Sequence, residues 1–158
     1  MKPESYITEF YQHFDEDHRL TSKHGSIEFL TTMHYIQKYL RPKDRILEIG
    51  TGTGRYAHTL ARAGYVVDAV ELVEHNIDIF LKNSTPSEKI TISKGNALDL
   101  SAFPDNQYDI TLLLGPLYHL FCMEDKRQAL REAIRITKPG GIIFASYVIS
   151  DGCLLDEG

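Results

Sequence analysis

The sequence predicts a doubly wound α/β fold, in which helices cover both faces of a mostly parallel sheet. Three observations support this prediction. From Arg45 onward, short apolar segments typical of strands alternate with segments that have helical spacing. The connections between these segments are short, which favours parallel βαβ units with right-handed crossovers. Residues 108–114 are almost wholly apolar, as expected for a central strand that is buried on both faces.

Residues 1–42 differ from the rest of the chain, because they are rich in aromatic, histidine and charged residues and contain no strand-like run. We expect a short helix at residues 7–14 and a longer one at residues 26–40, where apolar side chains recur near helical spacing. Pro42 follows the second helix as a stop signal. The sequence therefore predicts an N-terminal helical segment over residues 1–42 and a core over residues 43–158.

The core is expected to contain five strands and three long helices. The expected strands cover residues 45–49, 65–70, 89–94, 108–114 and 142–149. The expected helices cover residues 55–63, 73–83 and 125–136. Gly64 fits the C-cap position of the first of these helices, and residues 138–141, Lys-Pro-Gly-Gly, predict a tight turn before the last strand.

Composition and charge limit the classes of partner. Hydrophobic residues make up 42% of the chain and charged residues 25%, which is typical of one soluble globular domain. The net charge of −5, without a Lys/Arg cluster, argues against nucleic acid or an anionic membrane as partner. We expect no signal peptide and no membrane span, and hence a cytoplasmic location. The cysteines and histidines lack metal-ligand spacing, so no metal site is predicted.

A glycine-rich segment, Glu-Ile-Gly-Thr-Gly-Thr-Gly over residues 48–54, lies between an expected strand and an expected helix. Its glycines, Gly50, Gly52 and Gly54, allow a sharp backbone turn and the close approach of a ligand. The helix that follows directs its free N–H groups and positive dipole end to the same place. Such a loop alone is a weak signal, because some doubly wound proteins use it only as a turn.

Two acidic residues make the signal more specific. Glu48 stands before the first glycine, and Glu71 lies at the end of the next expected strand. An acid about 20 residues after the loop can accept hydrogen bonds from both ribose hydroxyls of a bound nucleoside. Asp68, on the same strand as Glu71, is expected to face solvent or to lie at a different height.

The spacing of the small residues bears on the kind of nucleoside. A dinucleotide fingerprint, G-x-G-x-x-G/A, fails when counted from Gly50 because Arg55 takes the last position, and it fits only in a frame shifted to end at Ala57. A carboxylate such as that of Glu48 would also repel a pyrophosphate. It would tolerate or attract the ammonium and sulfonium of S-adenosylmethionine.

The run EIGTGTGRYA resembles motif I of the class I (Rossmann-like) S-adenosylmethionine-dependent methyltransferases. Residues 67–72, 95–97, 108–115 and 138–141 resemble later motifs of this family in the family's order, so the resemblance covers roughly residues 44–150. It is nearest to small-molecule methyltransferases of the ubiquinone/menaquinone type. The resemblance implies cofactor-binding roles for Glu48, Gly50, Thr51, Gly52, Gly54, Glu71, Leu72, Asn96, Ala97, Leu114 and Gly115.

The sequence also departs from the family pattern. Asn96 stands where the family commonly has an Asp that reads the adenine amino group; its amide oxygen can still accept, without charge assistance. The family's sheet normally has strands 6 and 7 beyond the fifth, and here both are expected to be missing, which leaves the strand order 3-2-1-4-5 and a core truncated at its C-terminus. The fifth strand would then be an exposed edge, so pairing with a second copy in a homodimer is one expectation.

Candidate residues for chemistry follow the fourth expected strand. Tyr118 and His119 are expected at the carboxyl edge of the sheet, where ligands bind in open α/β folds. His119 would act as a base or line the pocket; alternatively, it caps a turn while its apolar neighbours pack on the core. In similar methyltransferases the N-terminal segment often forms a lid. Tyr11 would then face the sulfonium and Arg19 the methionine carboxylate, unless this segment is simply a solvated amphipathic helix.

The expected function is methyl transfer by in-line displacement from S-adenosyl-L-methionine to a small-molecule acceptor, with S-adenosyl-L-homocysteine as product. Two alternatives remain open on the sequence. One is an NAD(P)-dependent oxidoreductase, and the other is a non-catalytic module that binds S-adenosylmethionine.

Overall fold

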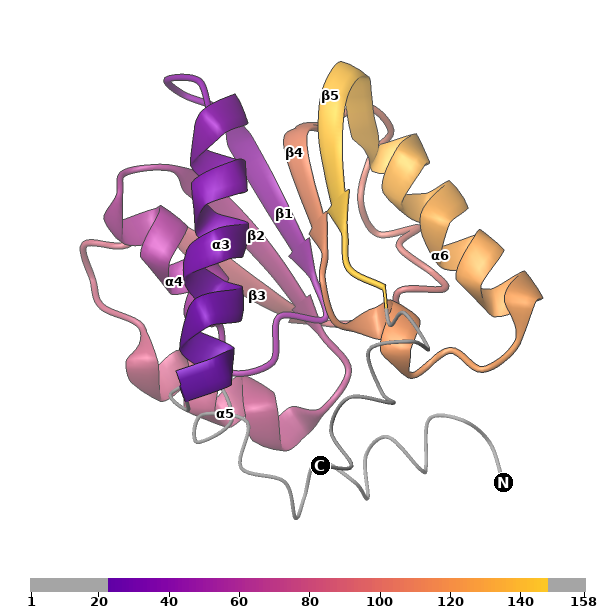
Figure 1. Ribbon diagram of the computed structural model, residues 1–158, viewed down its shortest axis with the longest axis horizontal. Helices are drawn as coiled ribbons and strands as arrows, with labels where there is room; N and C mark the ends of the chain where they lie inside the picture. Colours follow the sequence, from indigo (N-terminus) through magenta and orange to yellow (C-terminus); the bar gives the residue numbers. More distant parts are fainter. Residues whose placement is uncertain (1–22, 148–158) are drawn as a thin grey trace.

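The computed structural model describes residues 23–147 of the chain. These residues form a parallel sheet with strand order β3-β2-β1-β4-β5, flanked by helices, as Figure 1 shows. The predicted fold class and strand order are therefore confirmed. None of the helices in residues 23–147 is long and apolar enough to cross a membrane.

The elements follow one another in strict strand–helix alternation through the first three strands. The strands are β1 (Arg45–Ile49), β2 (Val66–Glu71), β3 (Ile90–Lys94), β4 (Tyr108–Leu113) and β5 (Thr137–Ala145). The helices are α3 (Lys23–Tyr39), α4 (Arg55–Arg62), α5 (Glu74–Asn83) and α6 (Met123–Ile136), with a short 3-10 helix η1 (Pro116–Tyr118) after β4.

The start of β5 differs from the sequence-based prediction. Tyr108 pairs with Thr137, so the strand begins at Thr137 rather than at residue 142. The predicted turn is taken up inside the strand: the register with β4 shifts between Tyr108 and Ile110, and Gly140 adopts a φ of 79°. An irregularity of this kind lets an edge strand carry a Pro-Gly-Gly run without breaking the sheet.

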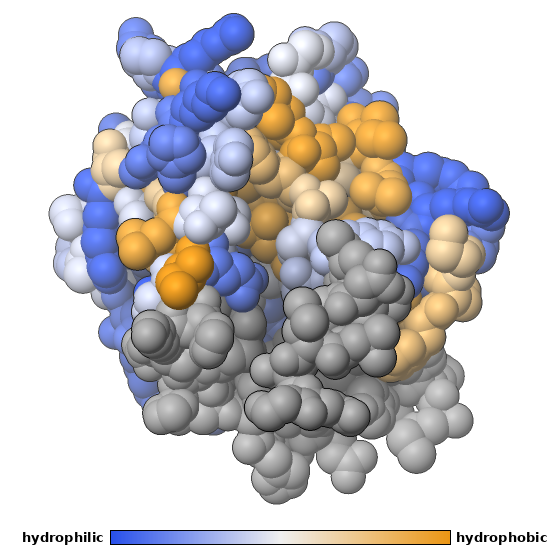
Figure 2. Space-filling model, in the orientation of Figure 1, coloured by the Kyte–Doolittle hydropathy of each residue, from blue (hydrophilic) through white to orange (hydrophobic). Residues whose placement is uncertain are grey.

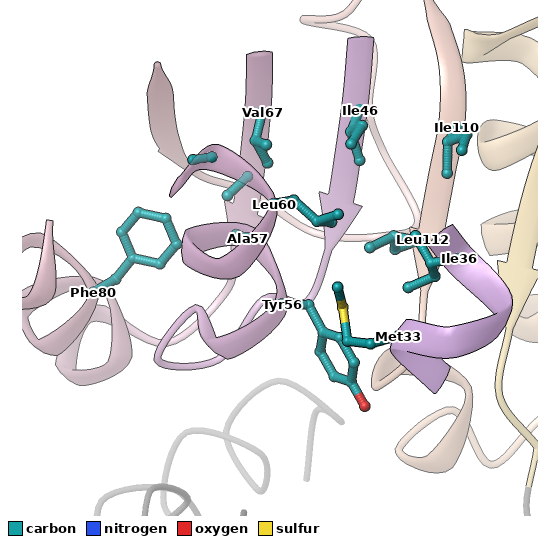
Figure 3. Close-up of a cluster of buried hydrophobic side chains, with 12 residues drawn as sticks. Met33, Ile36, Ile46, Tyr56, Ala57, Leu60, Val67, Phe80, Ile110 and Leu112 are labelled. Carbon is teal, nitrogen blue, oxygen red and sulfur yellow. The ribbon is translucent and has the colours of Figure 1, made fainter. Parts of the chain in front are cut away.

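Two buried clusters cover the two faces of the sheet, because successive strand residues point to opposite sides. Figure 3 shows the first cluster, in which α3, α4 and α5 pack on Ile46, Val67, Ile110 and Leu112. The second cluster joins α6 to the other face, through residues such as Leu47, Leu113 and Ile136. Burying each large aliphatic side chain contributes roughly 1.5–3 kcal/mol, so these two layers hold the strand ends in place.

Helix α3 belongs to the first of these layers. Its Met33 and Ile36 are buried in the first cluster, and the ring of Phe29 lies 4.9 Å from that of Tyr56 on α4. Residues 1–22, with the expected helix at 7–14 and the candidates Tyr11 and Arg19, lie outside the described residues. The lid role of the N-terminal segment stays a prediction.

Of the two alternatives expected for Asp68, the solvent-facing one is wrong, and the other agrees with contacts to Arg45 and Tyr108 at the starts of their strands. Asp68 is 7% exposed, and its carboxylate accepts hydrogen bonds from Arg45, Thr91 and Tyr108 at 2.8, 2.6 and 2.8 Å. Burial would raise the pKa of this carboxyl, but the hydrogen bonds and the Arg45 charge outweigh burial and leave the pKa below its usual value. Asp68 therefore ties β2 to β1, β3 and β4 within the sheet.

Candidate functional site

The candidate site lies at the edge of the sheet where β1, β2 and β4 end. Parallel strands end on the same side, so the segments that follow them meet there, which is where ligands bind in doubly wound folds. The glycine loop of residues 50–54 follows β1, and Glu71 is the last residue of β2. Residues 95–97 follow β3, and residues 114–119 follow β4.

The glycine loop turns directly over the end of β2. Gly50, Gly52 and Gly54 have φ angles of 70°, 59° and 92°, in the left-handed region that side chains avoid. The N–H groups of Gly50 and Thr51 both donate to the Val70 carbonyl, at 2.8 and 3.1 Å. The backbone of the loop is thereby fixed beside the end of the neighbouring strand.

The segment after β4 packs on the first glycine of this loop. An ideal Cβ placed on Gly50 would lie 2.6 Å from Cγ of Pro116, which is closer than real carbon atoms approach. Glycine at this position thus meets two requirements at once, a positive φ and contact with the ring of Pro116. This contact joins the loop after β1 to the loop after β4.

Glu48 fastens the glycine loop to helix α4. The residue is 2% exposed, and its Oε2 accepts hydrogen bonds from the Thr51 hydroxyl at 2.8 Å and from the Ala57 N–H at 2.9 Å. Burial raises the pKa of the Glu48 carboxyl to about 8, and the charge of Glu71 acts in the same direction against these hydrogen bonds. The raised pKa favours the protonated, uncharged form of this carboxyl near neutral pH.

Glu71 reaches from the end of β2 to the middle of the glycine loop. Its Oε2 accepts from the Gly52 N–H at 2.8 Å, and its Oε1 accepts from the Val73 N–H at 2.9 Å and from the Asn76 amide at 3.4 Å. Burial raises the pKa of this carboxyl above its ordinary value, although these hydrogen bonds oppose the shift. The sequence spacing placed Glu71 near the loop, and the structure brings the two into direct contact.

The segment after β3 is held to the same strand end. The Gly95 N–H donates to the Glu71 carbonyl at 3.0 Å. Asn96 uses its side-chain oxygen to accept from the Leu98 N–H at 3.0 Å, so it also shapes the turn in which it stands. Ala97 is buried in the second cluster, whereas Leu72, beside Glu71, is half-buried.

Tyr118 and His119 are half-buried at the C-terminal end of η1, the short helix whose first residue, Pro116, packs on Gly50. The backbone N–H of His119 donates to the Pro116 carbonyl at 3.0 Å and closes the short helix. Leu117 beside them is buried in the second cluster, as expected if the apolar neighbours of His119 pack on the core. Leu114 packs at the edge of the first cluster. An ideal Cβ on Gly115, between these two leucines, would lie 3.3 Å from the Gly50 carbonyl oxygen.

One buried polar cluster was not predicted. His58 on α4 is in contact with Glu88, its Nδ1 lying 2.7 Å from Oε2 of the carboxylate, and Arg62 donates to the other oxygen at 2.6 Å. His58 stands one helical turn after Gly54, but no sequence pattern connects it with a glutamate in the turn before β3. Among residues 23–147, no group of three or more His, Cys, Asp or Glu side chains is arranged to hold a metal ion.

A protein-family comparison agrees with this geometry. The family model described as "Methyltransferase domain" matches residues 47–145, which run from β1 to the end of β5. The chain belongs to this methyltransferase-domain family. The resemblance to class I S-adenosylmethionine-dependent methyltransferases, made from motif I and Glu71, is thereby confirmed.

Curated relatives share the same part of the chain. An S-adenosyl-L-methionine-dependent Diels–Alderase of Talaromyces variabilis is 34% identical over 61% of this chain and 34% of its own length. A ubiquinone biosynthesis O-methyltransferase of Rickettsia bellii is 29% identical over 65% of this chain and 41% of its own. A glycine/sarcosine N-methyltransferase of Aphanothece halophytica is 29% identical over 97% of this chain and 57% of its own. The chain thus spans between about a third and just over half of these relatives.

Solved structures show the same fold. An S-adenosylmethionine-dependent methyltransferase of Methanosarcina mazei matches 69% of this chain and 54% of its own, with a TM-score of 0.64 and 27% identity. A protein of Pyrococcus horikoshii OT3, at 22% identity, matches 85% of this chain and 63% of its own with a TM-score of 0.72, which bears on the fold alone.

Family and fold imply S-adenosyl-L-methionine as the cofactor, and the residues present fit it. The glycine loop brings backbone without side chains, in the left-handed region, to the strand ends, where a ligand can approach closely. Glu71, at the end of β2, is an acid of the type that can accept hydrogen bonds from ribose hydroxyls.

Proposed function

We propose that the protein transfers a methyl group from S-adenosyl-L-methionine to a small-molecule acceptor, by in-line displacement. The observation that carries this proposal is the contact between Glu71 and the glycine loop. A buried carboxylate at the end of β2 accepts from the Gly52 N–H at 2.8 Å, so an acid for ribose and a backbone cradle for an amino-acid tail lie side by side.

The proposed cofactor residues divide along the edge of the sheet. Glu71 and Leu72 would contact the ribose, and Asn96 and Ala97 would contact the adenine. The loop residues Gly50, Thr51, Gly52 and Gly54 would shelter the methionine part, with Leu114 and Gly115 bordering it from the end of β4. Glu48 would act mainly by holding Thr51 and the start of α4 in place, and its carboxyl would attract the cofactor's positive charge once it is ionised.

The chemistry of the reaction places few demands on the protein. The bound cofactor supplies an electrophilic methyl group on a sulfonium, so the chain's own residues bind, orient and exclude water. Alignment of donor and acceptor at about 3–3.5 Å lowers the barrier by roughly 7–11 kcal/mol. We propose that His119 accepts the acceptor's proton and that Tyr118 lines the acceptor's side of the site. Tyr11 and Arg19 would complete the site as part of a lid.

The net charge of the chain and the names of its relatives favour a small organic acceptor. The net charge of −5 disfavours nucleic acid, and the relatives include a 27-O-demethylrifamycin SV methyltransferase of Amycolatopsis mediterranei and a glycine/sarcosine methyltransferase. We propose that the protein acts in the cytoplasm and apart from membranes.

Calorimetric titration with S-adenosylhomocysteine and with NAD(P) tests the cofactor, and transfer of a labelled methyl group to a panel of small acceptors tests the reaction. The proposal expects binding of S-adenosylhomocysteine, no response to NAD(P), and labelled product. Tight NAD(P) binding without a response to S-adenosylhomocysteine would replace it with the oxidoreductase alternative.

A second candidate is use of the same cofactor without methyl transfer. The relative at 34% identity is named for a Diels–Alder reaction and as dependent on S-adenosyl-L-methionine. In that case the chain would bind the cofactor without transferring its methyl group, either to support another reaction or as the non-catalytic module. Binding of S-adenosylhomocysteine together with the absence of labelled product across the acceptor panel would favour this candidate.

We also propose that a homodimer forms through β5. This strand is one edge of the sheet in the described residues, and Figure 2 shows hydrophobic side chains gathered beside α3, over the area of β4 and β5. An edge strand with unpaired backbone groups favours pairing with a second copy, and the hydrophobic side chains on the adjoining face favour their coverage in such a pair. Sedimentation equilibrium tests the proposal, and a monomer at all concentrations would overturn it.

A further inference from the structure

His58 lies directly beneath the last glycine of the cofactor loop. Its backbone N–H donates to the Gly54 carbonyl at 2.8 Å, and its ring packs against Phe80 at a centroid distance of 4.3 Å. An ideal Cβ on Gly54 would lie 2.4 Å from Cδ2 of Phe80 and 2.8 Å from Cδ2 of His58. The rings of Phe80 and His58 therefore pack directly against Gly54.

The orientation of the His58 ring is fixed by Glu88, which lies in the turn before β3. Its Nδ1 lies 2.7 Å from Oε2 of Glu88, whose side chain is 0% exposed. Arg62 donates to the other carboxylate oxygen at 2.6 Å and to the Asn83 carbonyl at 3.1 Å. Burial would raise the pKa of Glu88, but the hydrogen bonds from His58 and Arg62 outweigh it and hold the pKa below its ordinary value. Glu88 is therefore ionised and accepts from an Nδ1–H.

The other ring nitrogen has no such partner. Within the described part of the chain, Nε2 of His58 is buried without a hydrogen bond, in a residue that is 4% exposed. An unsatisfied buried nitrogen is unfavourable, and an apolar side chain of similar size would fill the same space without that cost. Packing alone therefore does not explain a histidine here, whereas a ring held in one orientation by Glu88 does.

We propose that His58 is a positioning residue for the cofactor. Glu88 fixes the orientation of the His58 ring, and this ring fixes the position of Gly54 and thereby the conformation of the glycine loop. The effect passes through the backbone, because the Gly54 N–H donates to the Thr51 carbonyl at 3.0 Å and Thr51 in turn holds Glu48. This inference rests on the proposed function, since it assumes that the loop binds S-adenosylmethionine.

Two substitutions at this position distinguish the contribution of the His58 ring from that of its hydrogen bond to Glu88. His58→Asn keeps an amide donor near the place of Nδ1 but removes the ring, whereas His58→Phe keeps a ring but removes the donor. Each is expected to weaken binding of S-adenosylhomocysteine about ten-fold, as measured by calorimetry, because Gly54 no longer packs on a ring held in one orientation by Glu88. The KM for S-adenosylmethionine should rise while kcat at saturating cofactor is retained.

A third variant and a control complete the comparison. Glu88→Gln should weaken binding less than His58→Phe, because an amide oxygen still accepts from Nδ1–H, and the double variant should bind no more weakly than His58→Phe alone. Thr137→Val removes a buried hydroxyl that is hydrogen-bonded to Thr111, far from the loop. It should lower stability yet leave the affinity for S-adenosylhomocysteine unchanged.

Wild-type affinity in folded His58→Asn and His58→Phe would overturn the inference while leaving the proposed function in place. A wild-type chain that does not bind S-adenosylhomocysteine would overturn both. Should one His58 variant fail to fold, the other variant and Glu88→Gln carry the same comparison, with circular dichroism confirming the folded state of each.

Discussion

Pro116 packs against the Cα of Gly50, with so little space that an ideal Cβ on the glycine would lie 2.6 Å from Cγ of the proline. Gly50 follows β1, and Pro116 follows β4, so the contact bridges two neighbouring strands at the edge of the sheet that carries the candidate site. The glycine loop and the segment with Tyr118 and His119 are therefore parts of one packed unit. A substitution at either residue should therefore alter the packing of the other.

Replacing Gly50 should disrupt this unit. Gly50→Ala adds a methyl group that meets Pro116, at a φ of 70° where alanine is strained. We expect a loss of about 2–4 kcal/mol in the free energy of unfolding, from backbone strain and overpacking together. Urea unfolding measures it.

Gly64 offers a matched control. It has a φ of 98° but no atom within 4 Å of an added Cβ, so Gly64→Ala should show the strain alone, about 1–2 kcal/mol. Equal losses for the two alanine variants would show that the contact with Pro116 carries no energetic weight.

The buried carboxyl of Glu48 should make stability depend on pH. Its pKa of about 8 in the folded chain lies above the ordinary 4.5, so the folded state holds a proton that the unfolded state releases between these values. The resulting stabilisation is complete below about pH 4.5 and is lost as the pH rises through about 8. The free energy of unfolding should therefore fall toward alkaline pH, by at most about 1.4 kcal/mol per pH unit.

Glu48→Gln removes this proton while keeping an oxygen that can accept from Thr51 and Ala57. Its free energy of unfolding should change less between pH 5.5 and pH 8.5 than that of the wild type, as urea unfolding at the two pH values would measure. Parallel pH profiles for the two proteins would contradict the assignment of the raised pKa to Glu48.

Tyr108 should matter for stability and not for the cofactor. Its hydroxyl donates to the buried Asp68 carboxylate at 2.8 Å, away from the strand ends that form the site. Tyr108→Phe should cost roughly 1.5–3 kcal/mol, the range for hydrogen bonds to charged groups. Calorimetry should find unchanged affinity for S-adenosylhomocysteine in the folded variant, and a marked loss of affinity would mean that the site extends further into the sheet than we infer.

Local pattern predicted much of the fold and the site. The segment from β1 to Glu71 was predictable because its signals are local: an apolar strand, glycines that need positive φ, and an acid at the next strand end. The contact between Glu71 and Gly52 follows from strands that run parallel and end together.

Long-range pairings were not predictable in this way. Asp68 was expected to face solvent or to lie at a different height, and it is buried because the sheet register brings Arg45, Thr91 and Tyr108 around it. The pairing of His58 with Glu88 depends on how α4 packs beside the turn before β3. Such contacts are set by packing between distant segments and leave no spacing in the sequence.

Titration of S-adenosylhomocysteine into the wild type and Glu71→Gln tests the central claim most directly, with Glu74→Gln as control. Glu74 lies close by in sequence but is exposed and paired with Lys94. Loss of a charge-assisted ribose contact should weaken binding by about 10- to 100-fold in Glu71→Gln and leave Glu74→Gln at the wild-type affinity. If Glu71→Gln bound S-adenosylhomocysteine as tightly as the wild type does, the ribose would not be held at the end of β2, and the account of this site would be wrong.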